Sequence, residues 1–134
     1  MRNVLFVCKY NRFRSKVAEA FFKKYNKDKK IKAKSAGIIQ GSPINPVQKK
    51  VSQDFGINIK NPTRGISTKL LKWQDTIILV SDDVPESIFK DNKKFGKYLI
   101  VWKIPDAKAE NKQEIIRIIS MIDNKVKELI KNEK

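Results

Sequence analysis

Apolar residues form short continuous runs in three places along the chain. Residues 3–7, 76–80 and 98–102 are rich in β-branched and aromatic side chains, which is typical of strands, and the first two of these runs are expected to be buried. Residues 31–35 instead alternate between apolar and polar side chains, as a half-exposed edge strand does. The pattern therefore predicts four strands.

Between these strands, apolar residues recur at the three- and four-residue spacing of amphipathic helices. The spacing over residues 17–25 predicts a first helix that opens at Arg14 or Ser15. Further helices are expected from Pro46 to a stop at Gly56, over residues 68–73, in a short segment that ends at Phe89, and over residues 111–129.

The alternation of strands and helices indicates an α/β fold. Crossover helices between the two central apolar runs imply a doubly wound, four-stranded parallel sheet with helices on both faces. Ligands of such sheets bind beyond the carboxyl ends of the strands, so the loops after Val7, Val80 and Trp102 are candidate sites. The 134 residues are enough for one domain, and residues 1–134 are expected to form a single one.

The composition narrows the chemistry. The sequence contains no histidine and one cysteine, Cys8. Imidazole-based hydrolase triads, histidine-ligated zinc, internal disulfides and cysteine metal clusters are therefore excluded, and neither a metal nor another cofactor is expected. The apolar run before Cys8 is too short for a signal segment or a membrane span, so we expect a cytoplasmic protein without membrane contact.

The charge is strongly positive, with 30 Lys and Arg against 14 Asp and Glu and a formal net charge of +16. Such a charge suits a nucleic-acid binder, and it also attracts anionic substrates over long distances. The lysines are spread over nearly every segment, and no basic run is interleaved with aromatic residues as base stacking would require. A nucleic-acid partner is therefore not expected, and a non-catalytic phosphate- or RNA-binding protein is kept only as an alternative.

The most informative segment lies between the first predicted strand and the first predicted helix. Cys8 and Arg14 stand there with five residues between them. The backbone N–H groups of a tight loop that closes onto a helix N-terminus converge on a tetrahedral oxyanion, such as phosphate or sulfate. In such a loop Cys8 is favoured as a nucleophilic thiolate, and Arg14 can bind two anion oxygens. A buried core cysteine is the alternative interpretation.

The other loop residues have supporting roles in this interpretation. Ser15 is placed to donate its hydroxyl to the thiolate, and Asn11 tolerates the left-handed backbone that a tight loop needs. The remaining substrate-binding candidates are Lys9, Tyr10, Arg12 and Phe13.

Several of these motifs resemble one known family. VLFVC at residues 4–8, Asn11, Arg14, Ser15, AEAFF and the SAG at residues 35–37 resemble the low-molecular-weight protein tyrosine phosphatases and the thioredoxin-coupled arsenate reductases that share their fold. The family pattern is C-x-G-N-x-x-R-S. Residues 45–59 are similar to the reductase branch, and the likeness extends to residues 102–106, so it covers most of the chain.

The resemblance implies catalysis through a phosphocysteine, with an aspartate as general acid and then base. Asp106 matches that position. A carboxylate is also the natural proton donor in a protein without histidine. Asp106 as a helix cap or plain loop carboxylate is the competing interpretation, and Asp82 and Asp83 are rival acids after the third strand.

The sequence departs from the family at three points. Tyr10 stands where the pattern has glycine, Ala107 and Lys108 replace the proline and aromatic residues that usually follow the acid, and no second cysteine exists for an internal disulfide relay. We therefore expect a monomeric phosphomonoesterase of the tyrosine phosphatase type that acts on a phosphorylated protein or a small phosphoester. The alternative is a single-cysteine arsenate reductase resolved by an external thiol.

Overall fold

The computed structural model describes residues 1–108 and 110–132. Strands and helices alternate through most of the chain. In chain order the elements are β1 (Asn3–Cys8), α1 (Arg14–Tyr25), β2 (Lys32–Gly37), α2 (Pro46–Asp54), α3 (Thr68–Trp73), β3 (Thr76–Val80), a 3-10 helix (Glu86–Phe89), α4 (Lys90–Lys94), β4 (Tyr98–Trp102) and α5 (Lys112–Asn132).

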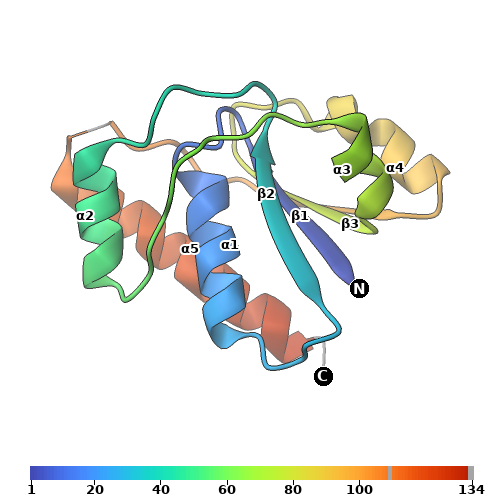
Figure 1. Cartoon of the computed structure of the whole chain (residues 1–134), viewed down its shortest axis with the longest axis horizontal. Coiled ribbons are helices and arrows are strands. Elements are labelled where there is room, and N and C mark those ends of the chain that lie inside the picture. The colour runs from blue at the N-terminus through green and yellow to red at the C-terminus, as the bar shows by residue number, and fades with distance from the viewer. Residues whose placement is uncertain (109, 133–134) are drawn as a thin grey trace.

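The four strands form one parallel sheet in the order β2-β1-β3-β4. In the register of this sheet, Val7 of β1 is paired with Ala36 of β2 on one side and with Leu79 of β3 on the other. β1 and β2 run upward in Figure 1, so the loops that follow their carboxyl ends lie at the top. Because the sheet is parallel, the carboxyl ends of β3 and β4 lie at the same edge. The predicted parallel α/β architecture is confirmed.

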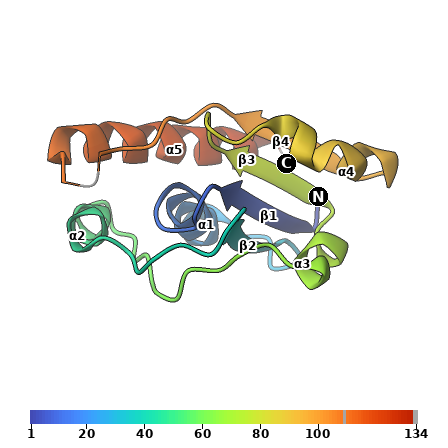
Figure 2. The same ribbon diagram turned by 90° about the horizontal axis from the view of Figure 1, so that it is seen from above.

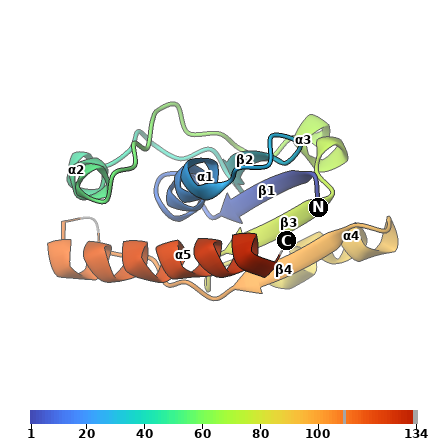
Figure 3. The same cartoon turned by 90° about the horizontal axis from the view of Figure 1, so that it is seen from below.

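Helices cover both faces of the sheet. Figures 2 and 3 show α1, α2 and α5 on one side, and α3 and α4 on the other. Side chains along β1 alternate between these layers: Val4 and Phe6 join the core under α1 and α5, while Leu5 and Val7 join the core under α3 and the 3-10 helix. Because β1 and β3 are buried on both faces, they read as continuous apolar runs.

Several element boundaries differ from the prediction. β2 is an edge strand, as expected, but it runs from Lys32 to Gly37 because its last residues pair with the end of β1. The short helix that ends at Phe89 is followed by α4, whose sequence KDNKK has no apolar periodicity to reveal it. The last helix continues to Asn132.

Among residues 1–108 and 110–132, no helix combines the length and the apolar character needed to cross a bilayer.

Candidate active site

The loop between β1 and α1 is held by the segment that follows β2. Ile38, Ile39 and Gly41 donate their backbone N–H groups to the carbonyls of Cys8, Lys9 and Tyr10, at 3.0, 3.1 and 3.0 Å. In a planar trans peptide the carbonyl and the next N–H point in opposite directions. The N–H groups of Lys9, Tyr10 and Asn11, which belong to the same three peptides, therefore point away from this segment and are free to converge on an anion.

Two glycines allow the close approach of this segment. An added Cβ at Gly37 would lie 2.6 Å from the carbonyl carbon of Tyr10 and 2.7 Å from the backbone nitrogen of Asn11. At Gly41 it would lie 2.7 Å from the carbonyl oxygen of Tyr10. Real Cβ atoms do not come this close to backbone, so the SAG motif is explained by packing against the loop.

Asn11 fixes the shape of the loop from below. Its φ of 56° is left-handed, the conformation expected for it. Its fully buried side chain donates to the hydroxyls of Ser15 and Ser35, at 2.7 and 3.0 Å, and accepts from the backbone N–H of Arg64 at 2.9 Å. One amide thus ties the loop to α1, to β2 and to the segment before α3.

Cys8 lies at the inner end of this arrangement. Its Sγ is 3.0 Å from Oγ of Ser15, and the residue is 2% exposed. The thiol donates to this hydroxyl, which also accepts from Asn11; when the thiol loses its proton, the serine hydroxyl can rotate and donate to the sulfur instead.

The N-terminus of α1 faces the same loop. Phe13 stands at the N-cap position and provides no side-chain hydrogen bond, whereas Asn45 caps α2 by accepting from the backbone N–H groups of Val47 and Gln48. The first turn of α1 contains no acidic residue among those described. Its orphan N–H groups and the positive end of its dipole therefore favour an anion at the loop.

Arg14 connects the loop to the other strand ends. Its side chain, 2% exposed, donates to the Ile104 carbonyl at 3.0 Å and to the Ser81 hydroxyl at 3.2 Å, and it pairs with Asp83 at 3.1 Å. Carboxylate oxygens of Asp82 and Asp106 lie 3.8 Å from its guanidinium nitrogens. All three candidate acids therefore surround one guanidinium.

The surroundings of Asp83 keep its carboxyl group ionised, which does not suit a proton donor. Burial by itself would raise the pKa of Asp83, but the hydrogen bond from Ser81 and the positive charge of Arg14 outweigh burial and hold the pKa below its ordinary value. Asp83 is therefore ionised at neutral pH and suited to hold Arg14 in place.

A cavity of about 170 Å³ opens over the loop. It is lined by the following eight residues: Cys8, Tyr10, Arg12, Phe13, Arg14, Gln48, Asp106 and Ala107. Of the three rival acids, Asp106 lines this cavity, whereas Asp82 and Asp83 line a separate hollow before the 3-10 helix.

Three predicted site residues, Lys9, Asn11 and Ser15, do not line the cavity. Asn11 and Ser15 are fully buried under the loop, so their side chains support it rather than face the cavity. Lys9 instead places its Nζ 5.4 Å from the centre of the Tyr10 ring.

Tyr10 and Arg12 form the rim. Tyr10 is 40% exposed and is absent from the positive-φ residues of the described chain, so the position occupied by glycine in the family pattern accommodates its side chain without strain here. Arg12 donates twice to the Pro43 carbonyl, at 3.1 and 2.9 Å.

Sequence reasoning missed Gln48 as a lining residue. It lies in the first turn of α2, far from the loop in sequence, and α2 packs against α5 rather than the sheet. Its polarity within an amphipathic helix gave no sign that it would face the loop.

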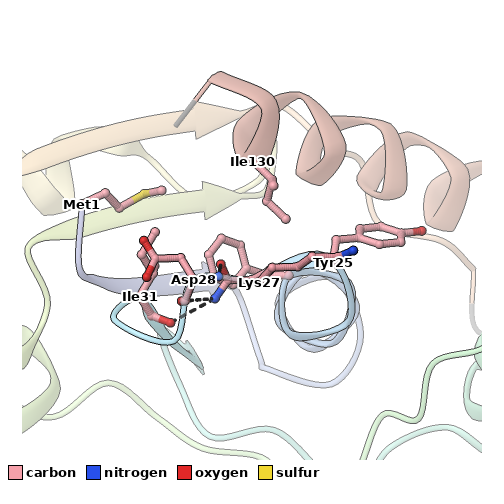
Figure 4. Close-up of a pocket in the computed structure, with 8 residues that line it drawn as sticks. Met1, Tyr25, Lys27, Asp28, Ile31 and Ile130 are labelled. Carbon is pink, nitrogen blue, oxygen red and sulfur yellow. Dashed lines mark hydrogen bonds between the residues drawn. The ribbon is translucent and has the colours of Figure 1, made fainter. Parts of the chain in front are cut away.

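A larger cavity lies at the other end of α1, away from the thiol. It measures about 450 Å³ and is bordered by Met1, Tyr25, Ile31 and Ile130, among others (Figure 4). Its polar contacts are local, for example from the Asn26 amide to the carbonyls of Asp28 and Ile31. The candidate chemistry is therefore assigned to the smaller cavity, which contains Cys8.

Among residues 1–108 and 110–132, no cluster of three or more His, Cys, Asp or Glu is arranged to hold a metal ion.

A buried cysteine at a strand end, a loop with inward N–H groups and an arginine at the helix start are the features of the class of cysteine-based phosphatases. Comparison with protein families agrees. Residues 3–134 match the model of the low molecular weight phosphotyrosine protein phosphatases, and the chain belongs to this family.

Solved structures with the same fold include phosphatases and arsenate reductases. The YwlE arginine phosphatase from Geobacillus stearothermophilus is 19% identical with a TM-score of 0.83, over 98% of this chain and 92% of that one. Wzb from Vibrio vulnificus, in complex with benzylphosphonate, is 20% identical with a TM-score of 0.81, over 97% of both chains. The arsenate reductase from Archaeoglobus fulgidus is 25% identical with a TM-score of 0.74, over 95% of this chain and 98% of that one.

Proposed function

We propose that this protein is a phosphomonoesterase of the protein tyrosine phosphatase type that works through a phosphocysteine intermediate. The observation that carries the proposal is the meeting of Cys8, Arg14 and Asp106 around one small cavity. Cys8 is the nucleophile, Arg14 and the loop N–H groups bind the phosphoryl oxygens, and Asp106 is the proton donor.

In the first step the Cys8 thiolate attacks phosphorus, and the bond to the ester oxygen breaks. Asp106 gives its proton to the departing oxygen. Arg14 must then bind phosphoryl oxygens, which requires its guanidinium to turn from Asp83 towards the anion while staying between the same loops. In the second step water attacks the phosphocysteine, Asp106 accepts a proton, and phosphate leaves with the thiolate restored.

The rim favours an aromatic or peptide-borne phosphoester. Tyr10 offers an exposed ring and Phe13 an apolar wall, in place of the aromatic residues that follow the acid in other members of the family. We propose a phosphorylated protein or a small phosphoester as substrate and a monomer as the active form. A lone thiol required in its reduced state suits the cytoplasm.

The test is hydrolysis of p-nitrophenyl phosphate by the purified protein. We expect Cys8-dependent activity that survives a metal chelator and disappears in Cys8→Ser. Chelator-sensitive activity, or activity unchanged in Cys8→Ser, would contradict the proposal.

Arsenate reduction resolved by an external thiol is the second candidate. It is supported by the 25% identity to the Archaeoglobus fulgidus arsenate reductase over most of both chains. An internal disulfide relay is not available to this chain, because Cys8 is its single cysteine. Arsenate-dependent oxidation of glutathione that requires Cys8, without phosphatase activity, would establish this alternative.

A further inference from the structure

Gln48 has an unusual environment for a residue that lines the cavity. It is 5% exposed, and its hydrogen bonds within the described part of the chain come from its backbone: the N–H donates to Asn45, and the carbonyl accepts from Ser52. The side-chain amide has no partner there. Since no buried side-chain nitrogen or oxygen of the described residues lacks a hydrogen-bond partner, the Gln48 amide must reach the open space of the cavity, where it is available for a group that enters.

The positions of the cavity residues indicate which group that is. Cys8, 2% exposed, lies at the inner end, whereas the Asp106 side chain, 52% exposed, lies towards solvent. In-line displacement places the leaving oxygen on the side of phosphorus opposite the sulfur, next to the acid. In the second step water must occupy the same position, because attack on the phosphocysteine reverses the direction of displacement.

We propose that Gln48 positions the attacking water during hydrolysis of the phosphocysteine; this inference rests on the proposed function. The water donates one hydrogen to the Asp106 carboxylate and the other to the Gln48 carbonyl oxygen, which turns an oxygen lone pair towards phosphorus. The oxygen–phosphorus bond forms, the phosphorus–sulfur bond breaks with its electrons returning to Cys8, and Asp106 takes the proton.

The same geometry makes the contribution of Gln48 specific to one step. In the proposed orientation the carbonyl oxygen of Gln48, and not its NH2 group, faces this position, so the departing oxygen, which receives its proton from Asp106, gains no hydrogen bond from Gln48 in the first step. In the second step the water has two hydrogens. A second acceptor beside Asp106 holds the second hydrogen, so that the water cannot turn its lone pair away from phosphorus. Since an amide does not ionise, Gln48 cannot replace Asp106 as the base.

The experiment compares Gln48→Met with Gln53→Met in stopped-flow and steady-state assays with p-nitrophenyl phosphate. Both substitutions exchange an amide for a thioether on α2, but Gln53 is exposed and does not line the cavity. For Gln48→Met we expect a first turnover within about threefold of the wild-type rate and a steady-state rate lower by roughly 10- to 100-fold. A phosphorylated enzyme should accumulate and be detected by intact mass after an acid quench. Gln53→Met should behave as wild type.

Each alternative outcome has a distinct meaning. Equal losses in the first turnover and the steady state, or no loss in either, would overturn the water-positioning role. If Gln48→Met does not fold, Gln48→Ala is measured in the same way, with added glycerol as a competing acceptor: a role in positioning water predicts that phosphate transfer to glycerol is affected less than hydrolysis. Absence of Cys8-dependent phosphate release in the wild type would refute the proposed function itself, and this inference with it.

Discussion

Asp106 and Asp83 both lie close to the Arg14 guanidinium, but we expect them to have different roles. Asp106→Asn removes the proton donor of the first step, so kcat/KM should fall by roughly 10²- to 10⁴-fold for alkyl or phenyl phosphate and less for p-nitrophenyl phosphate, whose leaving group needs less protonation. Asp83→Asn should weaken the hold on Arg14 and cause a smaller loss that does not depend on the leaving group. Steady-state kinetics on both ester types measure the difference.

The assignment of the acid would be wrong if the leaving-group dependence followed Asp83 instead. Asp82→Asn is a useful third comparison, since Asp82 is equally close to Arg14 as Asp106 but lies outside the cavity.

Gly37 provides a second prediction for a single residue. Gly37→Ala places a methyl group 2.6 Å from the backbone of Tyr10, and neither backbone can move without reshaping the loop. We expect a destabilisation of about 1–3 kcal/mol in urea denaturation and a loss of activity. Gly96→Ala is the comparison for activity: an alanine is strained at its φ of 75° and lowers stability, but nothing lies within 4 Å of the added Cβ, so activity should be kept. A stable, fully active Gly37→Ala protein would contradict the packing described for the loop.

Among single residues, the sequence identifies site residues that lie close together along the chain but not those that only tertiary packing brings to the site. Cys8, Asn11 and Arg14 could be identified because one short loop contains them all. Gln48 could not, since only the packing of α2 brings it to the cavity. The choice among Asp82, Asp83 and Asp106 likewise depended on where three separate loops meet.

At the scale of elements, Asp75 joins the beginnings of the strands at the end opposite the site. Its carboxylate accepts the backbone N–H groups of Arg2 and Asn3 at 2.9 Å each, and the Thr76 hydroxyl at 2.8 Å. Burial acts to raise the pKa of Asp75, but these hydrogen bonds outweigh it and hold the pKa below its ordinary value. The ionised carboxylate therefore stabilises the pairing of β1 with β3.

This depressed pKa predicts a dependence of stability on pH. The unfolded chain takes up the proton first, so the contribution is complete above about pH 4 and is lost as the pH falls through the folded-state pKa. Asp75→Asn should cost about 1–2 kcal/mol at neutral pH and flatten the acid limb of the stability profile. Urea denaturation over a pH series measures this, with the exposed Asp54→Asn as control. An equal flattening in the control would show that Asp75 has no special role.

The strands that could be predicted from the sequence are those with continuous apolar runs. The ranges of β3 and β4 match those expected because such runs have clear ends, although β3 is fully buried and the edge strand β4 is mostly half-exposed. The last two residues of β2 escaped prediction since they are fixed by pairing with β1. α4 escaped it because its polar sequence follows the 3-10 helix without an apolar stripe.

At the scale of the whole molecule, the net charge of +16 should act on association rather than on chemistry. We expect kcat/KM for an acidic phosphopeptide to fall by roughly 3- to 10-fold as salt rises from low to physiological concentration, with kcat nearly constant. A basic phosphopeptide of the same length should show a weaker dependence. Equal salt dependence for both peptides would show that the field of the protein does not guide substrates.

The same charge permits a direct test of the nucleic-acid alternative. Tight RNA binding with a steep salt dependence, unchanged by Cys8→Ser, would favour a binding protein over an enzyme.

The presence of a single cysteine affects how this protein responds to oxidative stress. A peroxide that reaches Cys8 oxidises its sulfur to a sulfenic acid, and Cys8 is the single cysteine of the sequence. Without a neighbouring thiol to trap the sulfenic acid as a disulfide, further oxidation to the irreversible sulfinic acid competes only with repair by small thiols from outside. The rate at which peroxide inactivates this protein irreversibly should therefore depend on the concentration of small thiols such as glutathione in its cell, because the protein cannot form a protective internal disulfide.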